Sequence, residues 1–193
     1  MARNPERRTA LLDAAIDVLA AAGARGLTFR AVDQQAGVPV GTASNYFADR
    51  EELLRQAGRY IFVRLAPDPG EVAERLASAP TRSLEVVLMQ DIVRRAQRDR
   101  AGYLAMLELR LEATRRPELQ ASLTDYHRAN LEEIVGHHTA GGFPGDRTTP
   151  VLLYLAMTGL IVEHLTLPEM LSTTTGALDD LVEDIVTSIV PER

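Results

Sequence analysis

Four residues, Ala36-Gly37-Val38-Pro39, interrupt two segments whose apolar residues recur with helical spacing. Gly37 tolerates a positive φ and therefore suits the position just past a helix end. Pro39 disfavours helix at Val38 but is well accommodated in the first turn of a new helix. The sequence therefore predicts that one helix ends near Gly37, that another begins near Pro39, and that a tight turn joins them.

The segment before this turn reads as a capped helix with one buried face. Thr28 can cap the helix with its hydroxyl. Phe29, Val32 and Ala36 follow at the spacing of an inward stripe. The stretch from Leu27 to Leu53 is therefore expected to begin with a short amphipathic helix.

The second predicted helix, Pro39–Phe47, is unusually short and has little to bury. Most of its residues are small or polar, and Phe47 is the natural anchor at its end. Downstream, Asp49 and Glu52 have the spacing of a capping box, with Asp in the Ser/Thr role. A helix this short is better suited to presentation than to scaffolding, and the major groove of DNA admits one helix. We therefore predict a helix-turn-helix that binds double-stranded DNA.

The residue types in this segment fit contacts with bases and phosphates. Gly41 permits close approach of the backbone, and Val40 can contact a thymine methyl group. Short polar side chains can meet base edges or phosphates, and Thr28 presents a helix N-terminus to phosphate. Tyr46 and Arg50 are expected to hold phosphates. For any single residue, the alternative is ordinary surface polarity. The predicted DNA-binding residues are Thr28, Arg30, Val40, Gly41, Thr42, Ser44, Asn45, Tyr46 and Arg50.

The composition removes several kinds of chemistry. The chain has no cysteine, which excludes disulfides, thiolate metal sites and a cysteine nucleophile. All 21 basic residues are arginine, so a phosphate-loop lysine and Schiff-base chemistry are also excluded. A cysteine-free chain suits a cytoplasmic protein, and we expect that location.

The net charge of -6 is unevenly distributed along the chain. Residues 1–64 contain nine Arg against seven Asp and Glu, a balance of +2, and residues 65–193 contain twelve against twenty, a balance of -8. Binding to DNA requires a local basic face and not a basic protein. Because the excess is small, we expect modest non-specific affinity and a salt-sensitive specific complex.

The first 22 residues resemble a signal peptide only superficially. Asp13 and Asp17 interrupt the apolar run on one helical face, which indicates an amphipathic helix that supports the reading helices. The strongest boundary in the chain is Pro67-Asp68-Pro69-Gly70. We therefore expect an all-α protein, with a helix-turn-helix domain at 1–64 and a helical ligand-binding and dimerisation domain at 65–193.

Two apolar segments near the C-terminus suggest a partner. The first, Val151–Leu165, is too short for a bilayer span, which needs about 20 residues. The second forms a helical stripe made up of Leu178, Leu181, Val182, Ile185 and Ile189. With no further chain to cover them, helices at about 150–165 and 177–190 are expected to form a homodimer. Packing of both within one monomer is the alternative.

The order of residues in the N-terminal segment resembles TetR-family transcriptional regulators between about Arg7 and Tyr60. The resemblance lies in Thr28-Phe29-Arg30, Ala36-Gly37-Val38, Gly41-Thr42, Asn45-Tyr46-Phe47 and Arg50-Glu51-Glu52-Leu53. The chain departs from the family pattern at Pro39, Val40, Ala43 and Ser44, which bear on the operator sequence. The resemblance implies a homodimeric repressor that binds a palindromic operator and is released by a small molecule.

The same resemblance implies an effector pocket in the C-terminal helices. Methionine and aromatic side chains with a few polar groups suit such a pocket. At helical spacing, however, the same residues are often ordinary core. The candidate pocket residues are Met89, Met106, Arg110, Tyr126, Asn130, Tyr154 and Met157.

Other functions have weaker support in the sequence. Glu133, His137 and His138 could form part of a metal site, but capping of the last helical carbonyls is the preferred interpretation. The chain has no G-x-S-x-G and no phosphate loop, so we expect neither an enzyme nor a cofactor. The alternative function is a helical small-molecule-binding or adaptor protein that does not read DNA.

Overall fold

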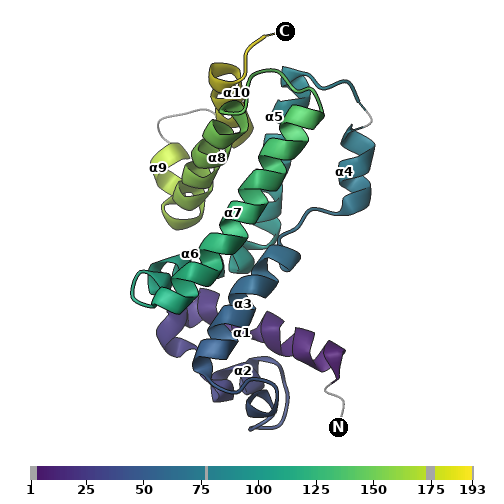
Figure 1. The fold of residues 1–193 in the computed structure, drawn as a ribbon. Coiled ribbons are helices and arrows are strands. Elements are labelled where there is room, and N and C mark those ends of the chain that lie inside the picture. The colour runs from purple at the N-terminus through teal and green to yellow at the C-terminus, as the bar shows by residue number, and fades with distance from the viewer. Residues whose placement is uncertain (1–3, 77, 173–176, 193) are drawn as a thin grey trace. The chain divides into compact units, whose positions relative to one another are not determined.

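The computed structural model describes residues 4–76, 78–172 and 177–192, and the secondary structure in these residues is helical throughout. This confirms the expected all-α fold. The elements, shown in Figure 1, are α1 (Pro5–Gly26), α2 (Phe29–Gln35), the 3-10 helix η1 (Ala43–Asn45), α3 (Arg50–Arg64), α4 (Pro69–Leu76), α5 (Arg82–Arg98), α6 (Arg100–Ala113), α7 (Pro117–Ala140), α8 (Thr149–Thr166), α9 (Pro168–Ser172) and α10 (Leu178–Ile189).

The chain divides into two compact units that are not consecutive in sequence. The first contains residues up to 66 together with 99–127, and the second contains 67–98 together with the residues from 128 onward. The break at Pro67 agrees with the sequence, but the chain returns to the first unit at Asp99. The reason is that α6 packs along α1 and α3, with Ala105 and Leu109 fully buried. The packing units thus differ from the expected domains at 1–64 and 65–193. We keep those two ranges as the proposed DNA-binding domain and the proposed ligand-binding and dimerisation domain.

The core of the first unit joins the helix-turn-helix segment to α6 and the start of α7. Phe47 is fully buried, as expected for the anchor after the turn. The other fully buried large side chains of this core come from α1, α2, α3, α6, α7 and the segment between α1 and α2: Leu11, Ile16, Leu19, Leu27, Val32, Leu53, Leu54, Ile61, Leu109 and Leu119.

Arg64, near the end of α3, connects three helices of this unit. Its Nε lies 2.7 Å from Oδ2 of Asp99, and its Nη1 lies 3.3 Å from Oδ1 of Asp13 and 3.5 Å from Oδ1 of Asp17. Asp99 is also the N-cap of α6, where it accepts a hydrogen bond from the Gly102 N–H at 3.0 Å. The hydrogen bond from Arg64 is the main cause that lowers the pKa of Asp99. One guanidinium therefore ties α1, α3 and α6 together.

The second unit has its own core between α5, α8 and α10. Its buried residues are Val93, Leu153, Met157, Leu160, Val182, Val186 and Val190. The stripe on α10 packs against α5 and α8, but of its five residues only Val182 is fully buried, and Leu178, Leu181, Ile185 and Ile189 remain partly exposed. Its use in a dimer therefore stays a prediction.

The opposite face of α8 is not covered within the described residues. Leu152 is 47% exposed and Leu155 is 59% exposed. The helix is 18 residues long with a mean hydropathy of 1.3, which is enough to cross a membrane by length and composition alone. A core helix of a soluble protein satisfies the same criterion, so this helix indicates a membrane span only weakly.

Candidate nucleic-acid interface

The first half of the helix-turn-helix forms as the sequence predicts. Thr28 is the N-cap of α2, and its hydroxyl accepts a hydrogen bond from the Ala31 N–H at 3.1 Å. The helix ends at Gln35, and Gly37 has a φ of +63°, the left-handed conformation expected just past a helix end. Asp49 caps α3 by accepting from the Glu52 N–H at 2.7 Å.

The second helix is different from the prediction. Residues 39–47 do not form an α-helix; only Ala43–Asn45 is helical, as a single 3-10 turn. Gly41 has a φ of +94°, which is incompatible with an α-helix. The segment 39–46, which we call the reading turn, is instead held by short side chains that bond to its own backbone.

Three of these side chains donate to two backbone carbonyls of the reading turn. The Thr42 hydroxyl donates to the Pro39 carbonyl at 2.6 Å. The Ser44 hydroxyl and the Asn45 amide donate to the Gly41 carbonyl at 2.8 and 3.1 Å. Such local bonds offer the backbone of the turn an alternative to helical bonding, and the more distant Asp33 adds to them.

Asp33, on α2, is a buried acidic residue beside the reading turn that the sequence did not single out. Its side chain is fully buried, and its two oxygens accept from the Gly41 N–H and the Ala43 N–H, each at 2.7 Å. The only local signal is an acidic residue directly after the buried Val32 in a short amphipathic helix. Its partners lie eight and ten residues away, across the turn, which helical spacing does not reveal.

The exposed surface of this segment is built mainly from the predicted DNA-binding residues. Val40 is 72% exposed, an unusual position for an aliphatic side chain. The other exposed members of the set are Thr28, Arg30, Gly41, Ser44 and Asn45, and the half-buried members are Thr42, Tyr46 and Arg50. The structure thus brings the nine residues into one segment, and their contacts with DNA stay a prediction.

The N-terminal helix holds the end of the reading turn. Arg8 donates to the Tyr46 carbonyl at 3.4 Å and to the side chain of Gln56, and its guanidinium lies 5.4 Å from the centre of the Phe47 ring. Because Phe47 is fully buried, this contact fixes the chain at the point where it leaves the turn.

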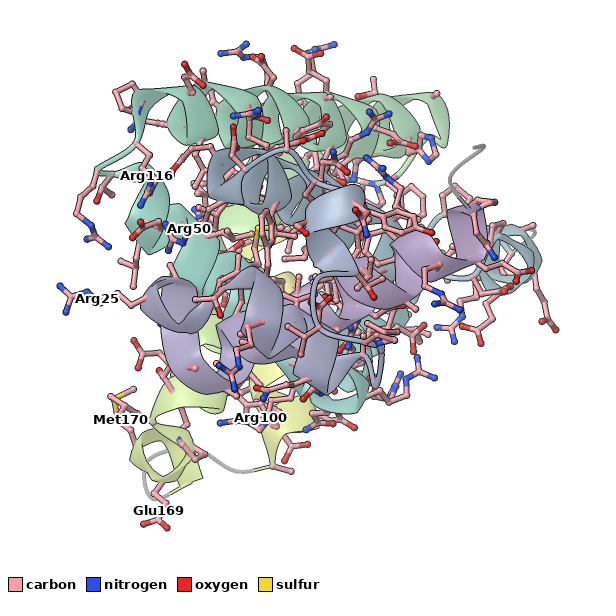
Figure 2. The ribbon with its side chains drawn as sticks, turned by 90° about the horizontal axis from the view of Figure 1, so that it is seen from below. Arg25, Arg50, Arg100, Arg116, Glu169 and Met170 are labelled. Atoms are coloured by element: carbon pink, nitrogen blue, oxygen red, sulfur yellow. The ribbon has the colours of Figure 1, made fainter. Side chains whose placement is uncertain are left out.

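Arg50 has intramolecular partners at the predicted phosphate-binding position. Its Nε donates to the Leu27 carbonyl at 3.1 Å, and its Nη2 donates to the Ala24 carbonyl at the end of α1. Carbonyls at a helix C-terminus carry partial negative charge that a guanidinium can satisfy. In Figure 2, Arg25 extends away from the ribbon, whereas Arg50 lies against it. Because these contacts already use the guanidinium within the protein, we expect a structural role for Arg50 in place of the predicted phosphate contact.

We expect Arg50→Met to lower the free energy of unfolding by about 1–2 kcal/mol, because two backbone carbonyls lose a charged donor. The salt dependence of DNA binding should change little. The matched control is Arg30→Met, at an exposed position of α2, which should leave stability intact and reduce the salt slope by about one ion if Arg30 contacts phosphate. Denaturant unfolding and binding titrations at several salt concentrations measure both effects. A reduced salt slope with unchanged stability would instead make Arg50 a phosphate contact.

The seven candidate pocket residues are divided between the two units. Met106, Arg110 and Tyr126 belong to the first unit, and Met89, Asn130, Tyr154 and Met157 belong to the second. Met106 is buried in the first core, whereas Met89 and Met157 contact the second core. The alternative of core packing therefore accounts for the three methionines.

Tyr126, one of these candidates, lies in a small cluster of aromatic rings in the first unit. The ring of Tyr126 lies 5.6 Å from that of Phe62, which also meets His127 edge-on at 5.0 Å. Burial lowers the pKa of His127, and the charge of Arg110 lowers it further. The neutral imidazole is therefore the favoured form in this group.

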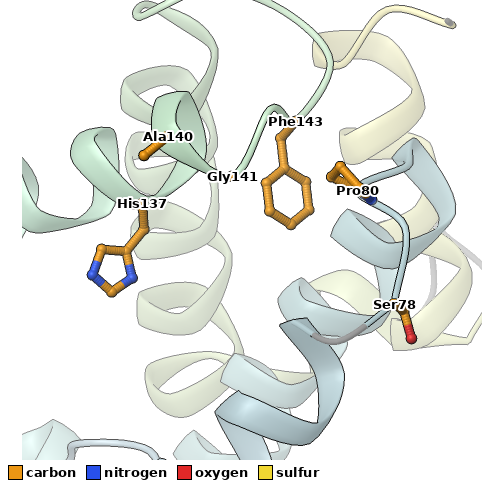
Figure 3. A pocket seen from close by; sticks show the side chains of 6 residues that line it. All are labelled: Ser78, Pro80, His137, Ala140, Gly141 and Phe143. Carbon is orange, nitrogen blue, oxygen red and sulfur yellow. The ribbon is translucent and has the colours of Figure 1, made fainter.

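A pocket of about 320 Å³ lies in the second unit and uses none of the seven candidates. Figure 3 shows the rings of Phe143 and Pro80 and the side chain of His137, which come from the loop after α7, the segment before α5, and α7 itself. The lining residues are Ser78, Pro80, His137, Ala140, Gly141 and Phe143.

His138 follows the pocket residue His137 in the chain, and its ring is paired with a carboxylate that the sequence did not reveal. Its Nδ1 lies 2.9 Å from Oε1 of the buried Glu85, and its ring stacks on Phe143 at 5.6 Å. Burial raises the pKa of Glu85, and His138 partly offsets that effect. His138 thus pairs with Glu85 and does not cap helical carbonyls. Nε2 of His137 lies 3.9 Å from Oε1 of Glu133. Within the described residues, no group of three or more ligand-type side chains could hold a metal ion.

In the described residues, a capped helix, a tight turn and a short exposed segment anchored by Phe47 lie in the order of a helix-turn-helix, within an all-helical fold typical of helix-turn-helix transcriptional regulators. Residues 11–57 match the family of bacterial regulatory proteins named tetR, and residues 80–192 match the tetracyclin repressor-like C-terminal domain. The chain therefore belongs to the TetR family. Regulators of this family bind DNA operators and small-molecule effectors, form dimers and are generally not enzymes.

Individual relatives agree with this family. The HTH-type transcriptional regulator BetI of Rhizobium meliloti (strain 1021) is 32% identical over 125 residues, which are 65% of this chain and 61% of that regulator. The match thus spans about three fifths of that relative. A TetR-family member from Streptomyces coelicolor A3 is 26% identical with a TM-score of 0.69, over 97% of this chain and 99% of that chain. The multidrug binding protein EbrR complexed with ethidium is 26% identical with a TM-score of 0.71, over 97% and 100%.

Proposed function

We propose that this protein is a sequence-specific repressor that binds a palindromic operator as a homodimer and is released by a small molecule. The observation that carries the proposal is the reading turn. Its Val40, Ser44 and Asn45 are exposed, and the turn is followed directly by the fully buried Phe47. A polar and apolar surface held on a rigid scaffold is what reading of base edges requires.

The predicted dimer would use the helices at about 150–165 and 177–190, and its centre would be the outward face of α8. Leu152 and Leu155 are one turn apart and both are exposed, while the opposite face of the helix is buried in the second core. A second copy would bury this face and bring two reading turns onto the operator. Dimeric helix-turn-helix proteins read half-sites about one helical turn, or a multiple of it, apart.

The effector would act by shifting the population between two arrangements of the helices. A ligand that prefers the arrangement whose reading turns do not match the half-site spacing would weaken operator binding. The similarity to EbrR, which is described as a multidrug binding protein, supports a small-molecule effector. The seven candidate residues stay our proposal for its site, and the cytoplasm stays our proposed location.

The first experiment is selection of bound fragments from random duplex DNA at moderate salt, followed by sequencing. The proposed function predicts an enriched palindrome, and its half-site spacing would give the separation of the two reading turns. If protein freed of carried-over ligand enriches no sequence, the protein is a helical binding module that does not read DNA.

Two substitutions in the reading turn should have different effects on the selected operator. We expect Tyr46→Ala to weaken binding to all sequences alike, by about fivefold to tenfold, because a phosphate contact carries no sequence information. Asn45→Ala should change the preferred base at one position of each half-site. Repeating the selection with both variants measures the two outcomes, and wild-type behaviour in both would show that the site assignment is wrong.

A further inference from the structure

We propose that Asp33 is a positioning residue for DNA reading: its buried carboxylate sets the backbone of the reading turn and thereby the sequence that the turn selects. The inference rests on the proposed function, because it concerns the same surface. Asp33 itself is fully buried and does not reach the exposed surface, so it would act only through the turn.

The geometry places one carboxylate between two backbone donors. Oδ2 accepts from the Gly41 N–H and Oδ1 accepts from the Ala43 N–H, both at 2.7 Å. These distances are typical of hydrogen bonds to a charged acceptor, which are stronger than neutral ones. Each oxygen thus fixes a different peptide group of the turn.

The reading turn and the Asp33 carboxylate satisfy each other's hydrogen-bonding groups. A buried carboxylate is tolerated only where hydrogen bonds satisfy it, and buried backbone N–H groups likewise need acceptors. A turn that is not an α-helix cannot satisfy the N–H groups of Gly41 and Ala43 with helical carbonyls. Asp33 supplies the missing acceptors, so a different backbone in residues 41–43 would leave a buried charge without its partners.

Gly41 is the point at which these interactions meet. Its N–H is held by Asp33, and its carbonyl accepts from the side chains of Ser44 and Asn45. Its φ of +94° is compatible with glycine and unfavourable for other residues. The orientation of this one residue therefore sets where the exposed Val40, Ser44 and Asn45 stand relative to α2.

The test is Asp33→Asn in the full chain, with the selected operator and an unrelated duplex of equal length as probes. Asparagine has one acceptor oxygen in place of two, so one backbone N–H loses its acceptor. We expect operator affinity to fall by about tenfold to a hundredfold. Affinity for the unrelated duplex should stay within about twofold, because the DNA contacts predicted for Thr28 and Arg30 lie outside the reading turn and only the phosphate contact predicted for Tyr46 lies in it.

The matched control is Asp49→Asn. It removes the same charge from the same head, but Asp49 is an exposed N-cap of α3, and asparagine caps equally well. This variant should keep the ratio of operator to unrelated affinity. An equal fall of that ratio in both variants would assign the effect to charge and overturn the proposal, as would an unchanged ratio in Asp33→Asn.

Amide hydrogen exchange gives a readout that does not depend on DNA. In Asp33→Asn, exchange at Gly41 and Ala43 should accelerate at least about tenfold, while Leu19 in the core of α1 keeps its wild-type rate. If the variant fails to fold, amide exchange in the wild-type protein tests the proposal instead. The amides of Gly41 and Ala43 should then exchange as slowly as that of Val32 inside α2, and fast exchange at these two residues would overturn the proposal. Failure of the proposed function is distinguishable, because wild-type protein would then select no operator at all.

Discussion

Replacing Arg64 with methionine is expected to lower the free energy of unfolding by about 2 kcal/mol at neutral pH. The guanidinium is half-buried and is shared among Asp13, Asp17 and Asp99. Its loss leaves three carboxylates close together without the positive charge that holds them, and it releases the end of α3 from the start of α6. The value lies between those of exposed and fully buried ion pairs because Asp13 and Asp17 are partly in solvent.

Chemical denaturation of both proteins measures this effect, with Arg55→Met as the control. Arg55 lies on the same helix, but its contact with Glu118 is longer, at 3.5 Å, and Glu118 is 86% exposed. Exposed ion pairs contribute little, so this variant should lose less than about 0.5 kcal/mol. Equal losses in the two variants would contradict a special role of Arg64.

The ion pair between Arg64 and Asp99 predicts how the loss of stability in Arg64→Met depends on pH. The pKa of Asp99 is lower in the folded protein than in the unfolded chain. Its contribution is therefore present above the unfolded value, near 3.9, and is lost as the pH falls through the folded value. The stabilities of wild type and Arg64→Met should converge below about pH 4, and a constant difference down to pH 2 would contradict the assignment.

Replacing Leu155 with glutamate is expected to convert the proposed dimer into a monomer. Leu155 is 59% exposed on the outward face of α8, so the free chain should tolerate the change, whereas an apolar interface between two copies would not. A monomer loses the second reading turn and the gain from simultaneous binding. Affinity for a palindromic operator should therefore fall by at least about a hundredfold.

Light scattering and operator titration test this prediction, and Leu111→Glu is the control. Leu111 has the same exposed fraction, 59%, but lies on α6 in the first unit. That variant should remain dimeric. A dimeric Leu155→Glu protein would show that α8 is not the interface, and a monomer that binds the palindrome as wild type does would show that dimerisation is not needed for reading.

The caps and the turn of the helix-turn-helix could be predicted because they depend on neighbours in sequence. Thr28 and Asp49 cap helices through backbone groups three residues away, and Gly37 adopts its positive φ at the next residue but one after α2. Such signals need no knowledge of the rest of the molecule. The same applies to the break at Pro67.

Other features depend on residues that are distant in sequence. The carboxylate of Asp33 reaches across the turn, and Arg50 bonds to carbonyls 23 and 26 positions earlier. Helical periodicity correctly found an apolar stripe on α10 but could not say whether α5 or a second copy would cover it.

The sequence by itself determined the helical class, the caps, the tight turn after α2 and the family, because these depend on local backbone preferences and on the order of residue types. Only the tertiary structure decided that the reading turn is not an α-helix, that α6 returns to the first unit, and that α10 packs against α5 and α8. Each of these outcomes is a competition between a local preference and a long-range partner. The partner's contribution is known only when the folded chain brings the two together.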